Sequence, residues 1–511
     1  MSFVSFNDMK YNHGGMTGIR LDMEEEEGNL ESLLKWAAVF GISDSKSLVV
    51  SYFHGAGGRG LGAARDLEKG ELVLKVPKSA LITRETLLLK DDHLSLAVNA
   101  HTSLSPIQTL CVCLLYEMGK GKTSWWYPYL INLPRSYDII ATFGEFEKQA
   151  LQVEDAIWAA DKAISKAEFE WKETNTLMEQ LKLKPQLRTF RAWLWASATV
   201  SSRTLHIPWD GAGCLCPVGD LFNYSAPVED SDSDNVELRT HELALQDMTT
   251  VKEETSCILD NEQLDSDSGR LTDGRFENNV GAYCFYAKKS YRKGEQVLLS
   301  YGTYTNLELL EHYGFLLNEN PNDKAYVPLE PEIYSSCSWP KEFLYIHQSG
   351  KPSFALLSAL RLWATPANRR RSVGHLAYSG LQLSIENEIF VMRWISNKCN
   401  SIVKNLPTTF EEDSLLLSVI DKIQNVNAPL EFANISSVST DEICTYRAEV
   451  LKKGATDSET VVSRKTMQRS RERWRLAVQW RLSYKKILVD CISFCDEMID
   501  VLRSQPSHTQ S

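Results

Sequence analysis

Two segments far apart in the chain repeat one pattern, a β-type run, a Lys-Gly-Glu turn and a second β-type run. The first segment spans Arg65 to Leu74, with its turn at Lys69-Gly70-Glu71, and the second spans Lys289 to Leu298, with its turn at Lys293-Gly294-Glu295. Such punctuation between β-type runs is typical of hairpins. We therefore expect two hairpins, and a β-rich core assembled from both ends of a long segment. Because no fixed period relates the two segments, a solenoid is not expected.

The stretch between these repeats is mostly helical. Ser105-Pro106 places a capping residue before a proline, as at the start of many helices. Beyond Pro328 the spacing of apolar residues is helical almost throughout, up to a last helix from Ser463 to Arg503. The predicted class is α+β, a β-rich domain with a helical insertion followed by an all-α C-terminal domain. The expected parts are a flexible acidic leader (1–29), the β-rich domain (30–325) with its helical insertion (about 95–200) and an acidic flexible loop (about 228–278), the helical domain (326–505) and a tail (506–511).

Composition narrows the classes of protein that fit. The chain has 511 residues, which suggests two to four domains, and a formal net charge of −12, which disfavours nucleic acid as the main partner. No apolar run reaches transmembrane length, and the first residues lack the pattern of a secretory signal, so no membrane association is expected. The eleven scattered cysteines fit a reducing compartment. We expect a cytoplasmic or nuclear protein rather than a plastid one.

A glycine-rich stretch contains the pattern GxGxxG at Gly55, Gly57 and Gly60. In dinucleotide-binding proteins this pattern follows a strand and opens a helix, whose N-terminus meets the pyrophosphate. Here the following residues, Ala63 to Pro77, have the pattern strand, turn, strand. A dinucleotide site is therefore disfavoured. Two interpretations remain, a loop whose backbone approaches a ligand and a flexible hairpin loop without a ligand.

Tyr301 ends the second β-type run, Glu295 to Tyr301, where the chain changes direction. From Asn306 the apolar spacing becomes helical, and this short helix stops at Gly314. Binding and catalytic residues are common at such ends of elements. The alternative interpretation is a half-buried core tyrosine, which is common in folded proteins.

The neighbourhood of Tyr301 resembles the C-terminal half of the SET methyltransferase domain, in the branch typified by plant Rubisco large-subunit lysine methyltransferase. The matching pattern is Gly-Glu, then Tyr301-Gly302, then Asn306 and Tyr313-Gly314-Phe315. Three further motifs fall in the order of that family, namely the glycine stretch, a Ser-Arg pair and an Asp-x-x-Asn motif. The family histidine that follows the Asn is a tyrosine here. The residues carried over are catalytic Tyr301 and, for the cofactor, Gly57, Gly58, Arg59, Ser202, Arg203, Asp220, Asn223, Tyr224, Tyr301 and Tyr313.

This resemblance implies an S-adenosylmethionine-dependent protein-lysine N-methyltransferase that needs no metal. Cys111-x-Cys113 and Cys214-x-Cys216 lack the spacing of a closed zinc site, in agreement with that expectation. The resemblance also implies that the C-terminal helical domain docks a protein substrate, and we expect a monomer. Two alternatives stay open: a SET-like scaffold that binds proteins without catalysis, favoured by Tyr224, and a protein-histidine methyltransferase.

Overall fold

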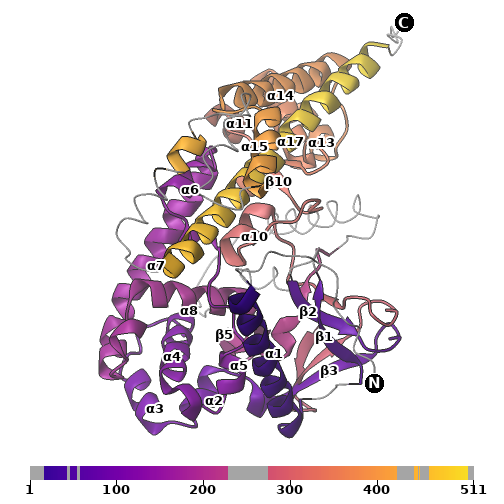
Figure 1. The fold of residues 1–511 in the computed structure, drawn as a ribbon. Coiled ribbons are helices and arrows are strands. Elements are labelled where there is room, and N and C mark those ends of the chain that lie inside the picture. The colour runs from indigo at the N-terminus through magenta and orange to yellow at the C-terminus, as the bar shows by residue number, and fades with distance from the viewer. Residues whose placement is uncertain are drawn as a thin grey trace, which may run out of the picture. The chain divides into compact units, whose positions relative to one another are not determined.

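The computed structural model describes residues 16–42, 46–53, 58–227, 274–422, 442–446, 448 and 460–504, with side chains described from residue 28 onward except 460–466 (Figure 1). Its described residues fall into two compact units. Unit 1 comprises residues up to Tyr137, Ala167–Ser225 and Arg270–Tyr301, and unit 2 comprises Asp138–Lys166 and the residues from Gly302 onward. Each unit has its own hydrophobic core.

Unit 1 contains the β-structure that the sequence predicts. Its strands form small sheets with the orders β1-β2, β3-β8-β7, β4-β5 and β6-β9, all antiparallel except the last pair, and Figure 1 shows β1, β2 and β3 among them. The strand bounds are β1 Leu48–Phe53, β2 Gly58–Ala63, β3 Leu72–Pro77, β4 Thr204–Ile207, β5 Asp210–Leu215, β6 Asn223–Tyr224, β7 Gly274–Glu277, β8 Ala282–Tyr286 and β9 Leu298–Leu299.

The two repeated segments pair with each other. Leu67 and Tyr291 occupy the same place in the two patterns, and each donates its backbone N–H to the carbonyl of the other, at 2.9 and 3.0 Å. The turn glycines are related in the same way, because Gly70 donates to the carbonyl of Ala287 and Gly294 to that of Ala63, both at 2.8 Å. The pairing is therefore locally two-fold symmetric, and it confirms a β core assembled from distant parts of the chain.

Each repeated residue has a structural reason. Gly70 and Gly294 have φ values of +84° and +90°, which side chains rarely adopt. The carboxylates of Glu71 and Glu295 accept hydrogen bonds from the backbone N–H groups of Glu68 and Arg292, at 3.1 and 3.0 Å. Glycine makes each turn possible, and the following glutamate closes it.

The prediction that each repeat forms its own hairpin is wrong. β2 pairs with β1, and β3 pairs with β8. The strands on either side of the second turn are β8 and β9. β8 pairs with β3 and β7, and β9 pairs with β6. The turn signal was correct, but the partner of each strand is set by burial in the core rather than by proximity in the chain. The glycine stretch differs from expectation in one respect, because its residues from Gly58 onward form β2 rather than a loop. As expected, a turn and a strand, β3, follow it rather than a helix.

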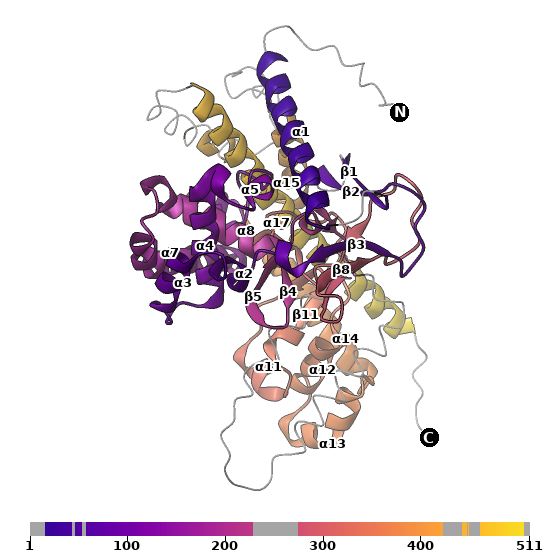
Figure 2. The same ribbon diagram turned by 90° about the horizontal axis from the view of Figure 1, so that it is seen from below.

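The helices of unit 1 include the predicted insertion (about 95–200) except for Asp138–Lys166, which belongs to unit 2. α4 begins at Pro106, and the side chain of Ser105 accepts a hydrogen bond from the N–H of Gln108, as expected of a cap. Figure 2 shows α2, α3 and α4 together. The helix bounds are α1 Met16–Val39, α2 Arg84–Leu88, α3 Asp92–Asn99, α4 Pro106–Lys120, α5 Tyr127–Leu130, α8 Phe190–Arg203 and the C-terminal part of α7, Glu154–Gln180.

Two predicted boundaries in unit 1 are corrected. α1 begins at Met16, so the predicted flexible leader is helical from there on. Glu24 to Glu27 lie within that leader, and glutamate is a good helix former. The predicted acidic loop ends before Gly274, where β7 begins, while its residues 228–273 lie outside the described part of the chain.

Unit 2 is mainly helical, as expected, and Figure 2 shows α12, α13 and α14 packed together. Within its described residues it departs from an all-α structure where β10 pairs antiparallel with β11. Among the described residues no helix has the length and apolarity to span a membrane. The bounds are α6 Glu145–Gln149, the start of α7, α10 Asn306–His312, β10 Lys324–Tyr326, α11 Pro331–Ser336, β11 Tyr345–His347, α12 Phe354–Trp363, α13 Ala367–Tyr378, α14 Ile385–Asn405, α15 Phe410–Lys422 and α17 Thr460–Ser504.

A buried charged cluster holds α15 and α17 together. Arg481 and Lys485, on one face of α17, and Asp413 of α15 all have side chains that are 0% exposed. Asp413 accepts from Arg481 at 2.7 Å and from Lys485 at 2.5 Å, and Glu442 accepts from Arg481 at 3.0 Å. Burial lowers the pKa of Lys485, so its charge depends on Asp413. Asp413 is thus the carboxylate on which both buried cations depend.

Replacing Asp413 should strongly destabilise unit 2. Asp413→Ala leaves Arg481 and Lys485 buried with one remaining carboxylate, and breaking a buried pair in this way costs about 3–5 kcal/mol. The exposed pair of Asp500 and Arg503 is the control, because Asp500→Ala should cost less than about 1 kcal/mol. Urea unfolding measures both. Equal losses in the two variants would contradict this account.

Candidate active site

Tyr301 lies against the backbone at Phe222. The parallel pairing of β6 with β9 places Asn223 beside Leu298 and Tyr224 beside Leu299, so the chain leaves β9 next to Phe222. There the half-buried Tyr301 donates a short hydrogen bond from its hydroxyl to the carbonyl of Phe222. Burial raises the pKa of Tyr301, so the phenol stays protonated at neutral pH. The phenolic oxygen of Tyr301 and the carbonyl oxygen of Phe222 therefore lie next to each other.

Tyr224, which replaces the family histidine, packs on Tyr301. The ring centroids are 5.2 Å apart and the ring planes make an angle of 42°. Tyr224 is only 9% exposed, so its side chain fills space inside the unit. The replacement is therefore accommodated within the packing around Tyr301.

A buried polar cluster fixes the loop that carries Phe222 and Asn223. The carboxylate of Asp220 accepts from the Tyr129 hydroxyl and from Nη1 of Arg203, both at 2.9 Å. Nη1 of Arg203 also donates to the Asp220 carbonyl, and its Nε donates to the Tyr137 hydroxyl at 3.2 Å. Burial first, and the Asp220 carboxylate next, raise the pKa of Tyr129, so that its hydroxyl remains a donor. The hydrogen bonds between Arg203 and Asp220 thus hold this loop in position.

The turn before this loop is strained. Val218 has a φ of +68°, although a β-branched residue is a genuine outlier in this region. Such a conformation costs on the order of 1–3 kcal/mol and persists only when its surroundings impose it. Here the N–H of Asp220 bonds to the Cys216 carbonyl at 2.9 Å, which closes the turn. The strain is stored directly beside Asp220.

Gly60 of β2 lies under two side-chain amides. A Cβ atom at Gly60 would approach Nδ2 of Asn223 to 2.6 Å and Nε2 of Gln296 to 2.9 Å, closer than real Cβ atoms come. Only glycine lets the backbone of β2 run beneath these amides. Asn223 and the glycine strand, which the sequence places far apart, therefore form one surface.

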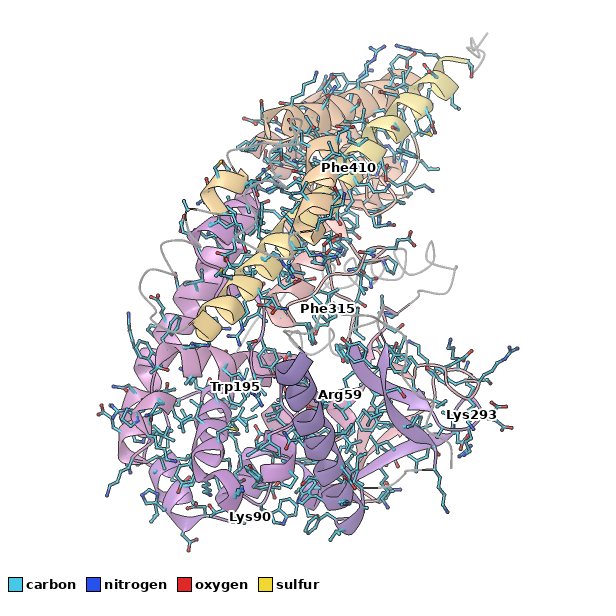
Figure 3. The ribbon with its side chains drawn as sticks, viewed as in Figure 1. Arg59, Lys90, Trp195, Lys293, Phe315 and Phe410 are labelled. Atoms are coloured by element: carbon cyan, nitrogen blue, oxygen red, sulfur yellow. The ribbon has the colours of Figure 1, made fainter. Side chains whose placement is uncertain are left out.

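Arg59 precedes this glycine and is anchored elsewhere in unit 1. Its guanidinium donates to the backbone carbonyl of Asn132 at 2.7 Å and to the Asn132 side chain at 3.3 Å. Asn132 in turn donates to the Asn29 carbonyl in α1 at 2.9 Å. Figure 3 labels Arg59. Its side chain thus ties β2 to the chain after α5.

The remaining predicted site residues are Ser202, Gly58, Gly57 and Tyr313. The Ser202 hydroxyl donates to the Ala198 carbonyl at 2.7 Å, inside its own helix. Gly58 starts β2 with a φ of +84°, while Gly57 lies outside the described residues. Tyr313 belongs to unit 2, where it ends α10 and packs on Tyr304 at 5.5 Å between ring centroids. Unit 1 brings together Tyr301, Asn223, Tyr224, Asp220 and Arg203.

The sequence interpretation missed Tyr129, Tyr137, Asn132 and Gln296. Tyr129 lies in the aromatic run from Trp125 to Leu130 and is only 2% exposed. One signal could have identified it, because a tyrosine in a buried apolar run usually needs a partner for its hydroxyl. Tyr137, Asn132 and Gln296 have no comparable signal. Among the described residues no group of three or more His, Cys, Asp or Glu side chains could hold a metal ion.

The chain is similar to known proteins over most of its length. Residues 307–488 match the family described as Rubisco LSMT substrate-binding. The chain is 53% identical over 500 residues to Protein SET DOMAIN GROUP 40 of Arabidopsis thaliana, covering 94% of this chain and 98% of that protein. It is 23% identical over 428 residues to the actin-histidine N-methyltransferase of Homo sapiens, covering 77% of this chain and 64% of that enzyme.

Solved structures share the fold. A structure of the SET domain of LSMT bound to lysine and AdoHcy matches with a TM-score of 0.55 at 17% identity, covering 94% of each chain. A structure of Rubisco LSMT bound to sinefungin and monomethyllysine matches with a TM-score of 0.55 at 18% identity, covering 93% of each chain. The predicted fold class, a SET domain with a helical C-terminal domain, is thereby confirmed.

The close approach at Gly60 predicts a stability difference between two glycines. Gly60→Ala must displace Asn223 or Gln296 and should cost about 1–3 kcal/mol, as overpacking does. A Cβ atom at Gly211 would meet no other atom within 4 Å, so Gly211→Ala should change stability by less than about 1 kcal/mol. Thermal unfolding of both variants measures the difference. A Gly60→Ala protein as stable as Gly211→Ala would show that the amides do not close over β2.

Proposed function

Because the chain belongs to the family of SET-domain proteins related to Rubisco LSMT, we propose that it transfers a methyl group from S-adenosylmethionine to a lysine side chain of a protein. The observation that carries this proposal is the contact of the Tyr301 hydroxyl with the Phe222 carbonyl. The chain that carries this contact shares its fold with a structure of the SET domain of LSMT bound to lysine and AdoHcy.

The amides over Gly60 suit a polar cofactor. Because Asn223 and Gln296 take up the space over Gly60, we expect these amides, rather than the Gly60 backbone, to contact the cofactor. Asn223 has both donors and an acceptor with which to bind an adenine edge or a ribose. S-adenosylmethionine supplies a methyl group on a positively charged sulfur.

The two oxygens at Tyr301 suit a developing positive charge. The phenolic oxygen of Tyr301 and the carbonyl oxygen of Phe222 both carry partial negative charge, and the hydrogen bond between them fixes the phenolic oxygen in place. Fixed dipoles of this kind stabilise charge without reorganising during the reaction. They would hold the amine in line with the methyl group, and such positioning can lower the barrier by about 7–11 kcal/mol.

The amine must be neutral before it can react. A lysine side chain entering a partly buried site loses hydration, which favours the neutral form and lowers its pKa. Tyr301 remains protonated at neutral pH, so it orients the amine as a hydrogen-bonding group instead of removing its proton as a phenolate. The proton therefore leaves to solvent before transfer, and the pH dependence of the rate should follow the lysine.

Binding of the cofactor is the first test of this proposal. Calorimetry with S-adenosylmethionine and S-adenosylhomocysteine should show saturable 1:1 binding to the full chain. Asn223→Ala removes a hydrogen-bonding amide and should weaken binding by about fivefold, the equivalent of about 1 kcal/mol. Asn99→Ala, an exposed change in α3, is the control and should bind as the wild type does. No saturable heat with either ligand would favour a scaffold without catalysis.

The second test separates catalysis from packing at Tyr301. Tyr301→Phe removes one hydroxyl and keeps the ring on Tyr224, so the fold and most of the cofactor affinity should remain. The single-turnover rate should fall, because the activation free energy should rise by about 2.7–4 kcal/mol, as it does when one preorganised hydrogen-bonding group is lost. Tyr286→Phe makes the same chemical change at a hydrogen bond to Glu277 and should leave the rate unchanged.

A result opposite to this pattern refutes the catalytic role. A core tyrosine would lose some stability on replacement and leave turnover alone. A Tyr301→Phe protein with wild-type turnover and a lowered melting temperature would thus assign Tyr301 to packing. Measuring rate, affinity and melting temperature on the same preparation distinguishes the two roles.

Histidine methylation is the second candidate. Relatives at 22–24% identity are named actin-histidine N-methyltransferases, although the chain spans 64% of the length of these enzymes. An imidazole is neutral at physiological pH for much of the time, so it needs less help to lose a proton than an ammonium does. We expect the helical C-terminal domain to dock the protein substrate in either case, since residues 307–488 match a substrate-binding family.

A further inference from the structure

One long stretch of unit 2 carries no acidic residue. Residues 343–385, all of which the structure describes, contain no aspartate or glutamate, although the whole chain has 67 of them and a net charge of −12. The stretch runs from β11 through α12 and α13 to the first residue of α14. It includes three consecutive arginines, Arg369, Arg370 and Arg371, near the start of α13. α13 and the loops on both sides of it are therefore basic.

The three arginines of α13 differ in what they contact. Arg370 donates to the backbone carbonyls of Thr365 and Trp363 at 2.9 and 3.0 Å, so it holds α13 against the end of α12. Arg369 and Arg371 are exposed, and neither has a hydrogen bond or an ion pair with any described residue. The guanidinium groups of Arg369 and Arg371 can therefore bind a ligand without breaking an existing contact.

Arg369 and Arg371 border the exposed face of α13. Successive residues turn by about 100° around a helix axis, so these two arginines lie about 160° apart. The arc between them holds Asn368, Ser372 and His375, all of which are exposed. Arginine presents planar pairs of donors that match a carboxylate. This face of α13 therefore fits a segment that carries carboxylates.

An exposed aromatic patch adjoins the start of α13, and Figure 2 shows α12, α13 and α14 together. The ring of Trp363, whose carbonyl holds Arg370, lies 5.9 Å from that of Phe390 and 5.9 Å from that of Trp394, measured between centroids. Phe390 is 48% exposed, and both tryptophans are half-buried. Aromatic residues and arginine are enriched at protein interfaces, where they contribute much of the binding energy. The patch thus offers an apolar contact next to the arginines.

The acidic residues of α14 do not cancel the charge of α13. Glu388 is buried and bonded to Arg361 at 2.7 Å. Glu386 is exposed in the first turn of α14, and Arg393, one turn after Phe390, is also exposed and has no partner within the described chain. The exposed charges of α14 beside Phe390 therefore balance each other, and the arginines of α13 remain in excess.

We propose that the exposed face of α13 and the adjoining aromatic patch bind an acidic segment of a partner protein. Carboxylates of the segment lie against Arg369 and Arg371, and an apolar side chain of the same segment lies on Phe390. A protein is favoured over nucleic acid or an anionic membrane, because a chain with a net charge of −12 repels an extended polyanion. The surface also lies within residues 307–488, which match a substrate-binding family.

Labelled peptides test the chemistry of the partner on the full chain. Fluorescence anisotropy at low salt and without cofactor would compare a peptide of four Glu-Glu-Leu repeats with one of four Gln-Gln-Leu repeats. The acidic peptide should bind saturably and at least about tenfold more tightly, because charge-assisted hydrogen bonds to arginine are lost in the neutral one. Equal binding of the two peptides, or no saturable binding of the acidic one, would overturn the proposal.

An oligothymidylate of the same charge as the acidic peptide tests the class of partner. It carries phosphates but no apolar side chain for the patch, so it should bind more weakly than the peptide. Tighter binding of the oligothymidylate would assign the surface to nucleic acid and overturn the proposal. Because no step of these measurements involves cofactor or turnover, a failure here would leave the proposed methyl transfer untouched.

Charge variants locate the peptide on α13. Arg369→Gln combined with Arg371→Gln should weaken binding of the acidic peptide about tenfold or more. Arg292→Gln combined with Lys293→Gln removes two exposed positive charges from unit 1, and it should leave the affinity within about twofold. An equal loss in the two double variants would reduce the effect to net charge and contradict a defined surface.

The aromatic patch has its own test. Phe390→Ala removes the exposed ring and should weaken binding of the acidic peptide about fivefold or more. Leu415→Ala on α15 is the matched control, because Leu415 is 44% exposed, and it should bind as the wild type does. Melting temperatures confirm that both variants fold. A folded Phe390→Ala protein with wild-type affinity would place the peptide elsewhere and overturn the proposal.

Discussion

The structure of unit 1 depends on the backbone pairing between two turn segments that lie at opposite ends of a long stretch of chain. The reciprocal hydrogen bonds of Leu67 and Tyr291 join them, and those of Gly70 and Gly294 extend the junction. The same pairing continues to Val297, whose N–H bonds to the Leu61 carbonyl at 2.8 Å. It therefore fixes where β9 starts, and β9 brings Tyr301 to Phe222. Loss of this junction would separate the glycine strand, the Asn223 loop and Tyr301.

Buried polar groups complete the positioning that the backbone begins. Asp220, Arg203 and Tyr129 satisfy one another under the loop, and the strained turn at Val218 is held by the same surroundings. Unit 2 uses the same principle at Asp413 and Lys485. Such clusters contribute little net stability compared with apolar packing. Removing one partner is nevertheless costly, because the remaining charge stays buried without compensation for its lost hydration. They therefore favour a single arrangement of the chain.

The sequence predicted elements better than it predicted partners. Local chemistry sufficed for the cap of α4 and the turns at Gly70 and Gly294, because each depends on residues that are close together in the chain. The strand pairings could not be predicted, since they depend on which faces become buried together. Site residues with a family motif, such as Tyr301 and Asn223, were identified by resemblance. Gln296, whose amide lies above Gly60, carries no motif, because its role exists only once distant segments meet.

The central claim is that this assembly transfers a methyl group to lysine, and product analysis tests it most directly. The purified chain would be incubated with methyl-labelled S-adenosylmethionine and protein extract from cells lacking it, and the labelled residues identified by mass spectrometry. The account predicts label on the Nε atom of lysine. Label confined to histidine, or no label above that of a heat-inactivated control, would contradict it.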